Sequence, residues 1–173
     1  VDSQGLGRDD RLVPEIIQKV YDSARCHLDP ESWLRHCEAL VDTDDITDAA
    51  QTRYGDYLIQ RMNDWLDLQI KAMGHCIDLA LQQENCQKVT DNLSDTLFQL
   101  QKLRDSQNWD EIVQRKDVDF GRLVFPKNFD EEAKEQIKSV RDLCKKGLEK
   151  QARAFENDSS QVLADLSASA DAL

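Results

Sequence analysis

A line of apolar residues repeats every seven positions within residues 45–103, and it limits the possible folds more than any other feature. Its members are Leu58, Trp65, Ala72, Leu79, Cys86, Leu93 and Leu100. Residues seven apart lie on the same side of an α-helix, so the line predicts a buried stripe on one or two long helices. No Gly or Pro marks a break, but a single rod could not bury its broad apolar face within one chain. We therefore expect two helices joined by a turn near residues 84–91.

Shorter apolar stripes predict further helices on both sides of this segment. One begins near Leu12 with Pro14 in its first turn, and the next follows Asp29, a suitable N-cap before Pro30. A final long helix is expected after Asp130. Its stripe consists of Ala133, Ile137, Val140, Cys144, Leu148, Ala152 and Phe155. The predicted fold class is all-α: an antiparallel bundle of four or more helices, with long amphipathic helices and one irregular packed loop.

The 173 residues are enough for one domain with a hydrophobic core. Residues 1–10 lack apolar periodicity and are predicted to form a disordered leader, residues 11–166 a single helical domain, and residues 167–173 a mobile tail. The least regular part of the domain is residues 105–128, where Gly121 and Pro126 punctuate an alternating segment that is typical of a packed loop.

Charge and hydropathy restrict the partners that we expect. The formal net charge is −12, which argues against nucleic acid and against anionic membrane surfaces, because both would repel an acidic protein. No run approaches eighteen consecutive apolar residues, so no membrane span is expected. The sequence therefore predicts a protein partner and no nucleic acid.

Cysteines and sequons favour export. Five cysteines allow two disulfides and one spare thiol, and Cys26 and Cys37 flank the bend at Pro30, where a hairpin disulfide is predicted. Asn92 and Asn157 each begin an Asn-x-Ser sequon, so both are candidate N-glycosylation sites. We predict a secreted or extracellular glycoprotein, with a cytoplasmic location as the alternative.

No residue pattern indicates catalysis or a cofactor. All three histidines adjoin cysteines, as Cys26-His27, His36-Cys37 and His75-Cys76. Neighbouring helical residues point about 100° apart and rarely bind one ion together, so no metal site is expected. The acidic pairs at predicted helix starts and in loops fit caps and solvated surface better than acid–base catalysis. Phosphate loops and hydrolase motifs are absent from the sequence. We expect a protein that is not an enzyme.

A cluster of apolar residues in the predicted loop is the candidate contact surface. It comprises Phe120, Leu123, Val124, Phe125 and Phe129. These side chains either plug the end of the bundle or form a patch for a partner. We interpret the chain as a non-enzymatic helical-bundle interaction protein that is exported and binds another protein. Two alternatives stay open: a carrier of a lipid or small apolar ligand inside the bundle, and an intracellular helical scaffold or assembly subunit, which could oligomerise.

Overall fold

In a computed structural model, the chain is described over residues 12–41 and 46–170, and these residues contain helices and no β-strand. The all-α prediction is confirmed. The predicted leader, residues 1–10, lies outside the described residues. The elements are α1 (Leu12–Ala24), α2 (Pro30–Val41), η1 (Ala49–Gln51), α3 (Arg53–Leu81), α4 (Gln87–Arg104), α5 (Trp109–Arg115), α6 (Glu131–Ala152), η2 (Arg153–Phe155) and α7 (Ser159–Ala170).

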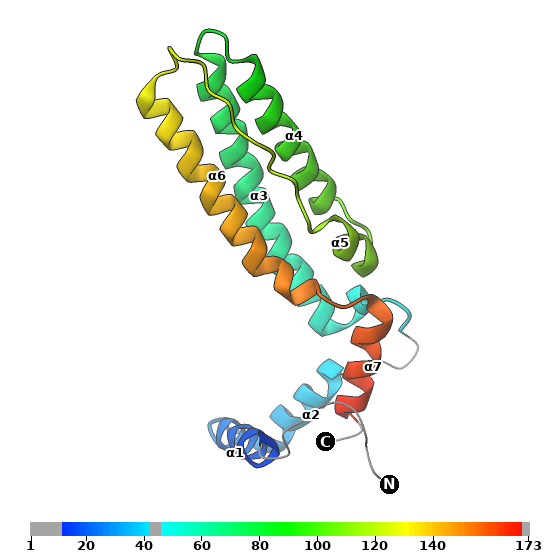
Figure 1. The fold of residues 1–173 in the computed structure, drawn as a ribbon. Helices are drawn as coiled ribbons and strands as arrows, with labels where there is room; N and C mark the ends of the chain where they lie inside the picture. The colour runs from blue at the N-terminus through cyan, green and yellow to red at the C-terminus, as the bar shows by residue number, and fades with distance from the viewer. Residues whose placement is uncertain (1–11, 42–45, 171–173) are drawn as a thin grey trace.

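Three long helices, α3, α4 and α6, lie side by side, with α4 and α6 antiparallel to α3 (Figure 1). The segment between α5 and α6, residues 116–130, which we call the strap, runs along the bundle between α4 and α6. Helices α1, α2 and α7 lie beyond the end at which α3 begins (Figure 1). None of the described helices is long and apolar enough to cross a membrane.

The predicted break in the long apolar segment is confirmed. Helix α3 ends at Leu81 and α4 begins at Gln87, and the turn between them contains Asn85 with φ of 55°. This left-handed conformation is costly for most residues but is tolerated by Asn, whose short polar side chain can hydrogen-bond locally. Asn85 therefore supplies the turn that neither Gly nor Pro marks.

The buried seam of α3 is not the seven-residue line seen in the sequence. The buried apolar side chains of α3 are Met62, Leu66, Met73, Cys76 and Ala80, at alternating spacings typical of a helix that packs on two neighbours. Leu58, Trp65, Ala72 and Leu79 border this seam and are only half-buried. On α4, by contrast, Leu93 and Leu100 of the line are fully buried. The line thus marks the edge of one helix and the core of the next.

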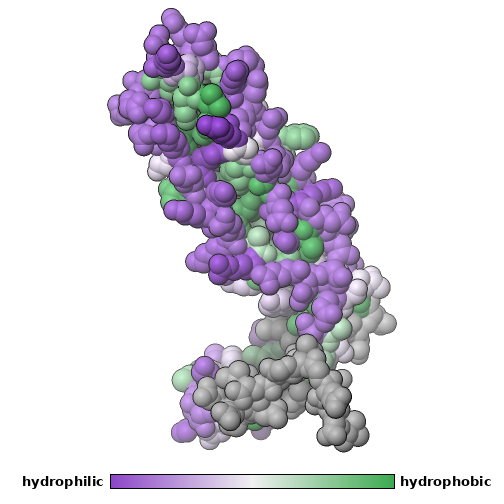
Figure 2. Space-filling model, viewed as in Figure 1, coloured by the Kyte–Doolittle hydropathy of each residue, from purple (hydrophilic) through white to green (hydrophobic). Residues whose placement is uncertain are grey.

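Helix starts follow the capping residues in the sequence. The predicted caps are confirmed at Asp29, which accepts a hydrogen bond from Ser32 N at 3.0 Å, and at Asp130, which accepts one from Ala133 N at 2.8 Å. Helix α7 continues to Ala170, so it extends beyond Leu166, where the sequence predicts the start of a tail. The outer surface is largely hydrophilic, with an apolar band between hydrophilic flanks of the bundle (Figure 2).

Candidate functional site

The predicted contact residues of the loop mostly cover the core. Phe120 and Phe129 are buried, and Leu123 and Phe125 are half-buried and pack against the same cluster, while Val124 is 49% exposed. Phe125 and Phe129 also meet edge to face, with ring centroids 5.0 Å apart. The strap therefore covers the groove between α4 and α6 along its length, and it offers little of the apolar patch that a partner would need.

Side chains from both flanking helices hold the strap backbone. Gln99 of α4 accepts a hydrogen bond from Asp119 N at 2.9 Å and donates one to Asp119 O at 3.2 Å. Asn92 of α4 and Arg141 of α6 both donate to Phe120 O, and Arg141 also donates to Gly121 O at 2.6 Å. These bonds satisfy backbone groups that have no helix or sheet partner. Burial lowers the pKa of Arg141 from its ordinary value.

The position of Asn92 argues against a glycan there. Its side-chain nitrogen donates to Phe120 O at 3.1 Å, and a Cβ at Gly121 would lie 2.6 Å from that nitrogen. A sugar attached to this nitrogen would displace the strap, so the N-glycosylation predicted at Asn92 conflicts with the structure. Asn157 is exposed, and its carbonyl oxygen accepts a hydrogen bond from Trp109 Nε1 at 2.9 Å.

All five cysteines are free thiols, so the disulfide predicted between Cys26 and Cys37 is not formed. Cys26 is exposed, and its sulfur donates to Asp22 O at 3.3 Å. Cys76 on α3 and Cys144 on α6 are buried, and burial raises the pKa of each thiol to about 11. Neutral buried thiols pack as small apolar side chains and are poor nucleophiles or metal ligands.

Within the described ranges, no group of three or more His, Cys, Asp or Glu side chains is arranged to hold a metal ion. His27 stacks on Trp33 with ring centroids 4.9 Å apart, next to an open depression of about 570 Å³ at the corner between α1 and α2. The histidines that adjoin cysteines therefore act as individual side chains and not as parts of a metal centre.

The starts of η1, α5 and α7 meet at one end of the bundle, in a cluster that we call the junction (residues 48–55, 109–112 and 155–159). Asp48 Oδ1 accepts hydrogen bonds from Ala50 N at 2.8 Å and Trp109 N at 3.2 Å. Ser159 Oγ accepts one from Ala49 N at 2.7 Å, and Ser159 N donates to Asp110 Oδ1 at 2.8 Å. Each helix start is thus capped partly by a residue of another element.

Aromatic packing fills the interior of the junction. Trp109 and Phe155 are fully buried, with ring centroids 4.6 Å apart. Gly55 lies so close to η1 that a Cβ placed there would be 1.8 Å from Ala49 O. The sequence predicts a short helix at Trp109, but it gives no indication that this helix would join two distant segments.

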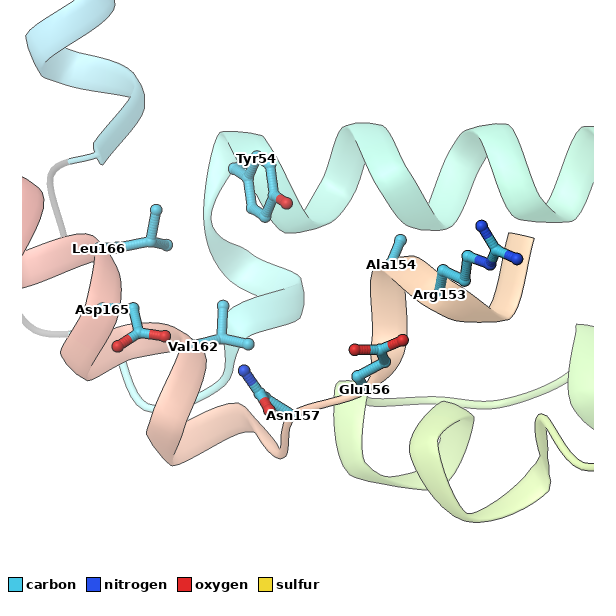
Figure 3. A pocket seen from close by; sticks show the side chains of 8 residues that line it. All are labelled: Tyr54, Arg153, Ala154, Glu156, Asn157, Val162, Asp165 and Leu166. Carbon is cyan, nitrogen blue, oxygen red and sulfur yellow. The ribbon is translucent and has the colours of Figure 1, made fainter. Parts of the chain in front are cut away.

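An open pocket of about 250 Å³ lies beside the junction (Figure 3). Tyr54 comes from the first turn of α3, Arg153 and Ala154 from the end of the α6–η2 segment, and three further lining residues from α7. The full lining consists of Tyr54, Arg153, Ala154, Glu156, Asn157, Val162, Asp165 and Leu166. The predicted carrier needs an enclosed apolar cavity inside the bundle, and this pocket is shallow, lies at the surface and contains charged groups.

The second half of α6, with Arg153, is basic in an otherwise acidic chain. Residues 141–153 contain five basic side chains and two acidic ones. Lys146, Lys150 and Arg153, spaced i, i+4 and i+7, lie on one exposed face and take part in none of the ion pairs of the described residues. The total charge of −12 hid this face, and a charge count over shorter windows of the sequence would have found it.

Comparison with known proteins shows similarity to one kind of DNA-processing enzyme, the first subunit of an ATP-dependent helicase/nuclease. The chain is 26% identical over 166 residues to this protein of Listeria welshimeri, 27% over 154 residues to that of Geobacillus kaustophilus, and 28% over 158 residues to that of Anoxybacillus flavithermus. These matches cover 92%, 86% and 86% of this chain, but only 13%, 12% and 13% of the respective relatives. No family model matches the chain.

These similarities correct four predictions. A helicase acts on nucleic acid and an ATP-dependent one needs ATP, so a secreted or extracellular interaction protein is the wrong class, and the cytoplasmic alternative fits better. The descriptions as a disulfide-bonded protein and as a glycoprotein fail with the predicted export, and the five thiols are free. The exclusion of nucleic acid is also wrong, because it relied on total charge, which says little about a local surface.

Proposed function

We propose that this chain is a helical scaffold segment of an intracellular protein related to the ATP-dependent helicase/nucleases. The observation that carries the proposal is the extent of the similarity: one stretch of the relatives aligns with 92% of this chain, which includes most of the helical bundle. A short segment that keeps its whole length within a much larger relative is expected to be one folding unit of that relative.

The internal architecture supports a scaffold. The buried seam of α3 continues through Leu93, Leu100 and Ile137 into one core, and the strap and the junction fix the irregular segments to that core. A bundle held in this way keeps its surface residues at fixed distances, which a segment that positions other groups requires.

We assign no catalytic residue to this segment. The titratable side chains of the pocket beside α7 face open solvent, and the two thiols with raised pKa are buried in the core. Within the proposed function, ATP hydrolysis and strand cleavage belong to other parts of such a protein, and this segment contributes shape and surface.

A segment exchange tests the proposal. In the Geobacillus kaustophilus relative, the aligned stretch is replaced by this chain, or by a flexible Gly/Ser linker of matched length as the control. We expect the exchange with this chain to retain ATP-dependent unwinding of a labelled duplex and the linker variant to lose it. Equal loss in both proteins would contradict the proposal, provided that both fold, as judged by thermal melting.

A further inference from the structure

We propose that the face formed by Arg61, Lys146, Lys150 and Arg153, together with Tyr54 and Tyr57, binds single-stranded nucleic acid. The inference takes the class of its ligand from the proposed function, and its geometry comes from the described residues alone. We call this surface the α3–α6 face.

The antiparallel packing of α3 and α6 brings the four cations together. Trp65 of α3 lies against Gly147 of α6, where an added Cβ would be 2.6 Å from Trp65 Cζ2. Arg61 is one helical turn before Trp65, and Lys150 is about one turn after Gly147. Because the helices run in opposite directions (Figure 1), these two side chains lie at the same level on adjoining edges.

Among the described residues, no ion pair neutralises any of the four cations. The ion pairs on α6 involve Lys134 and Lys138 in its first half, and that of α3 joins Asp67 to Arg104 of α4. An unpaired cation keeps its counterion, and release of such counterions drives binding to a polyanion. Glu156 and Asp165 border the pocket at one end of the face, so they limit its length there.

Two exposed tyrosines adjoin the cations. Tyr54 is 45% exposed and lines the same pocket as Arg153, and Tyr57 is 62% exposed, one turn before Arg61. Exposed aromatic rings beside a basic groove are the usual means of binding unpaired bases, because each base can stack on a ring. A duplex hides those faces, so the tyrosines favour a single strand over a duplex.

Charge selects nucleic acid over other occupants. An apolar partner would need a continuous apolar surface, and the lysines at i and i+4 interrupt one. An acidic peptide would satisfy the cations but would not use stacking on Tyr54 and Tyr57. Loss of affinity on removal of these rings therefore distinguishes the two polyanions.

The test measures fluorescence anisotropy of a labelled oligothymidine of about 20 nucleotides with this chain at about 50 mM salt. The variant K146E/K150E/R153E should bind at least about tenfold more weakly, and its slope of log affinity against log salt should be shallower by about 2. The matched control K71E/K88E/K127E makes the same charge change at exposed lysines elsewhere and should keep most of the affinity. Circular dichroism confirms that each variant is folded.

The second measurement concerns the rings. Y54S/Y57S should weaken oligothymidine binding about fivefold or more, and Y21S, a change at an exposed tyrosine of α1, should have no effect. The inference is overturned if the wild-type chain does not bind, or if both charge variants lose affinity equally. It is also overturned if a duplex or a polyglutamate peptide binds as tightly while Y54S/Y57S changes nothing.

The outcomes separate this inference from the proposed function. If the segment exchange retains unwinding but the isolated chain does not bind oligothymidine, the α3–α6 face fails and the scaffold stands. If the chain binds through the face but the exchange gives no unwinding, the binding site is supported and the scaffold within a helicase/nuclease is not.

Discussion

The strap and the junction are both irregular segments, but they are held in different ways. The strap lies in a groove and depends on long side chains that reach it from α4 and α6, and several of these bonds are exposed to water. The junction depends on short side chains and on backbone groups of helix starts, and its bonds surround buried Trp109 and Phe155.

This difference concerns what replaces each interaction once it is lost. A backbone group released at the surface of the strap can bind water, so its loss costs little. A backbone group released inside the junction stays buried without a partner, which costs its full desolvation free energy. We therefore expect mutations in the junction to destabilise the protein more than equivalent mutations in the strap.

The largest effect is expected at Gly55. In Gly55→Ala, the new methyl group would lie 1.8 Å from Ala49 O, a backbone atom that cannot move without disturbing η1. We expect a loss of about 3 kcal/mol or more in the free energy of unfolding, measured by urea denaturation. Gly74→Ala is the control on the same helix, because nothing lies within 4 Å of its Cβ, and it should stabilise α3 by about 0.5–1 kcal/mol. Equal effects at both positions would contradict the packing of the junction.

Ser159→Ala should have the next largest effect. It removes the acceptor of Ala49 N inside the junction, and we expect a loss of about 1–3 kcal/mol in the free energy of unfolding. The neighbouring exposed Ser160 provides the comparison, and Ser160→Ala should stay within about 0.5 kcal/mol of the wild type. If the two alanine variants unfold at the same urea concentration, the hydrogen bond of Ser159 is not important for stability.

Asn92→Ala tests the strap. The loss of its bond to Phe120 O should cost about 1 kcal/mol in the free energy of unfolding, less than Ser159→Ala, because Arg141 still donates to the same oxygen. Gln101→Ala, an exposed position on the same helix, is the control. Amide hydrogen exchange of residues 118–122 should increase in Asn92→Ala and remain unchanged in Gln101→Ala. A loss greater than that of Ser159→Ala would reverse the proposed ranking.

The smallest effect concerns pH and the core beneath both regions. Burial raises the pKa of Cys76 and Cys144 to about 11, so the folded state holds these protons more tightly than the unfolded state does. The resulting stability is fully present below about pH 9 and is lost as the pH rises towards 11. The urea midpoint of the wild type should therefore fall more steeply over this range than that of C76A/C144A, in which lysines and tyrosines still titrate. Parallel pH profiles would show that the thiols are not buried as described.

The sequence by itself determined the helical class, most helix starts and the existence of two long helices. These features are local: an N-cap such as Asp130 acts on an amide three residues away, and apolar periodicity is set by the geometry of a single helix. The same local information failed for cysteine pairing and for export, because neither sequons nor cysteine counts specify which groups are accessible or adjacent in space.

Only the tertiary structure decided which residues meet across the chain. The line of seven-residue spacing became the edge of the α3 seam because α6 approaches at Gly147, where the absence of a side chain leaves room for Trp65. The loop around Phe120 became a strap because Asn92, Gln99 and Arg141 lie within reach of its backbone. The basic face depends equally on helix packing, because Arg61 and Lys150 are far apart in the sequence and become neighbours only when α3 and α6 pack antiparallel.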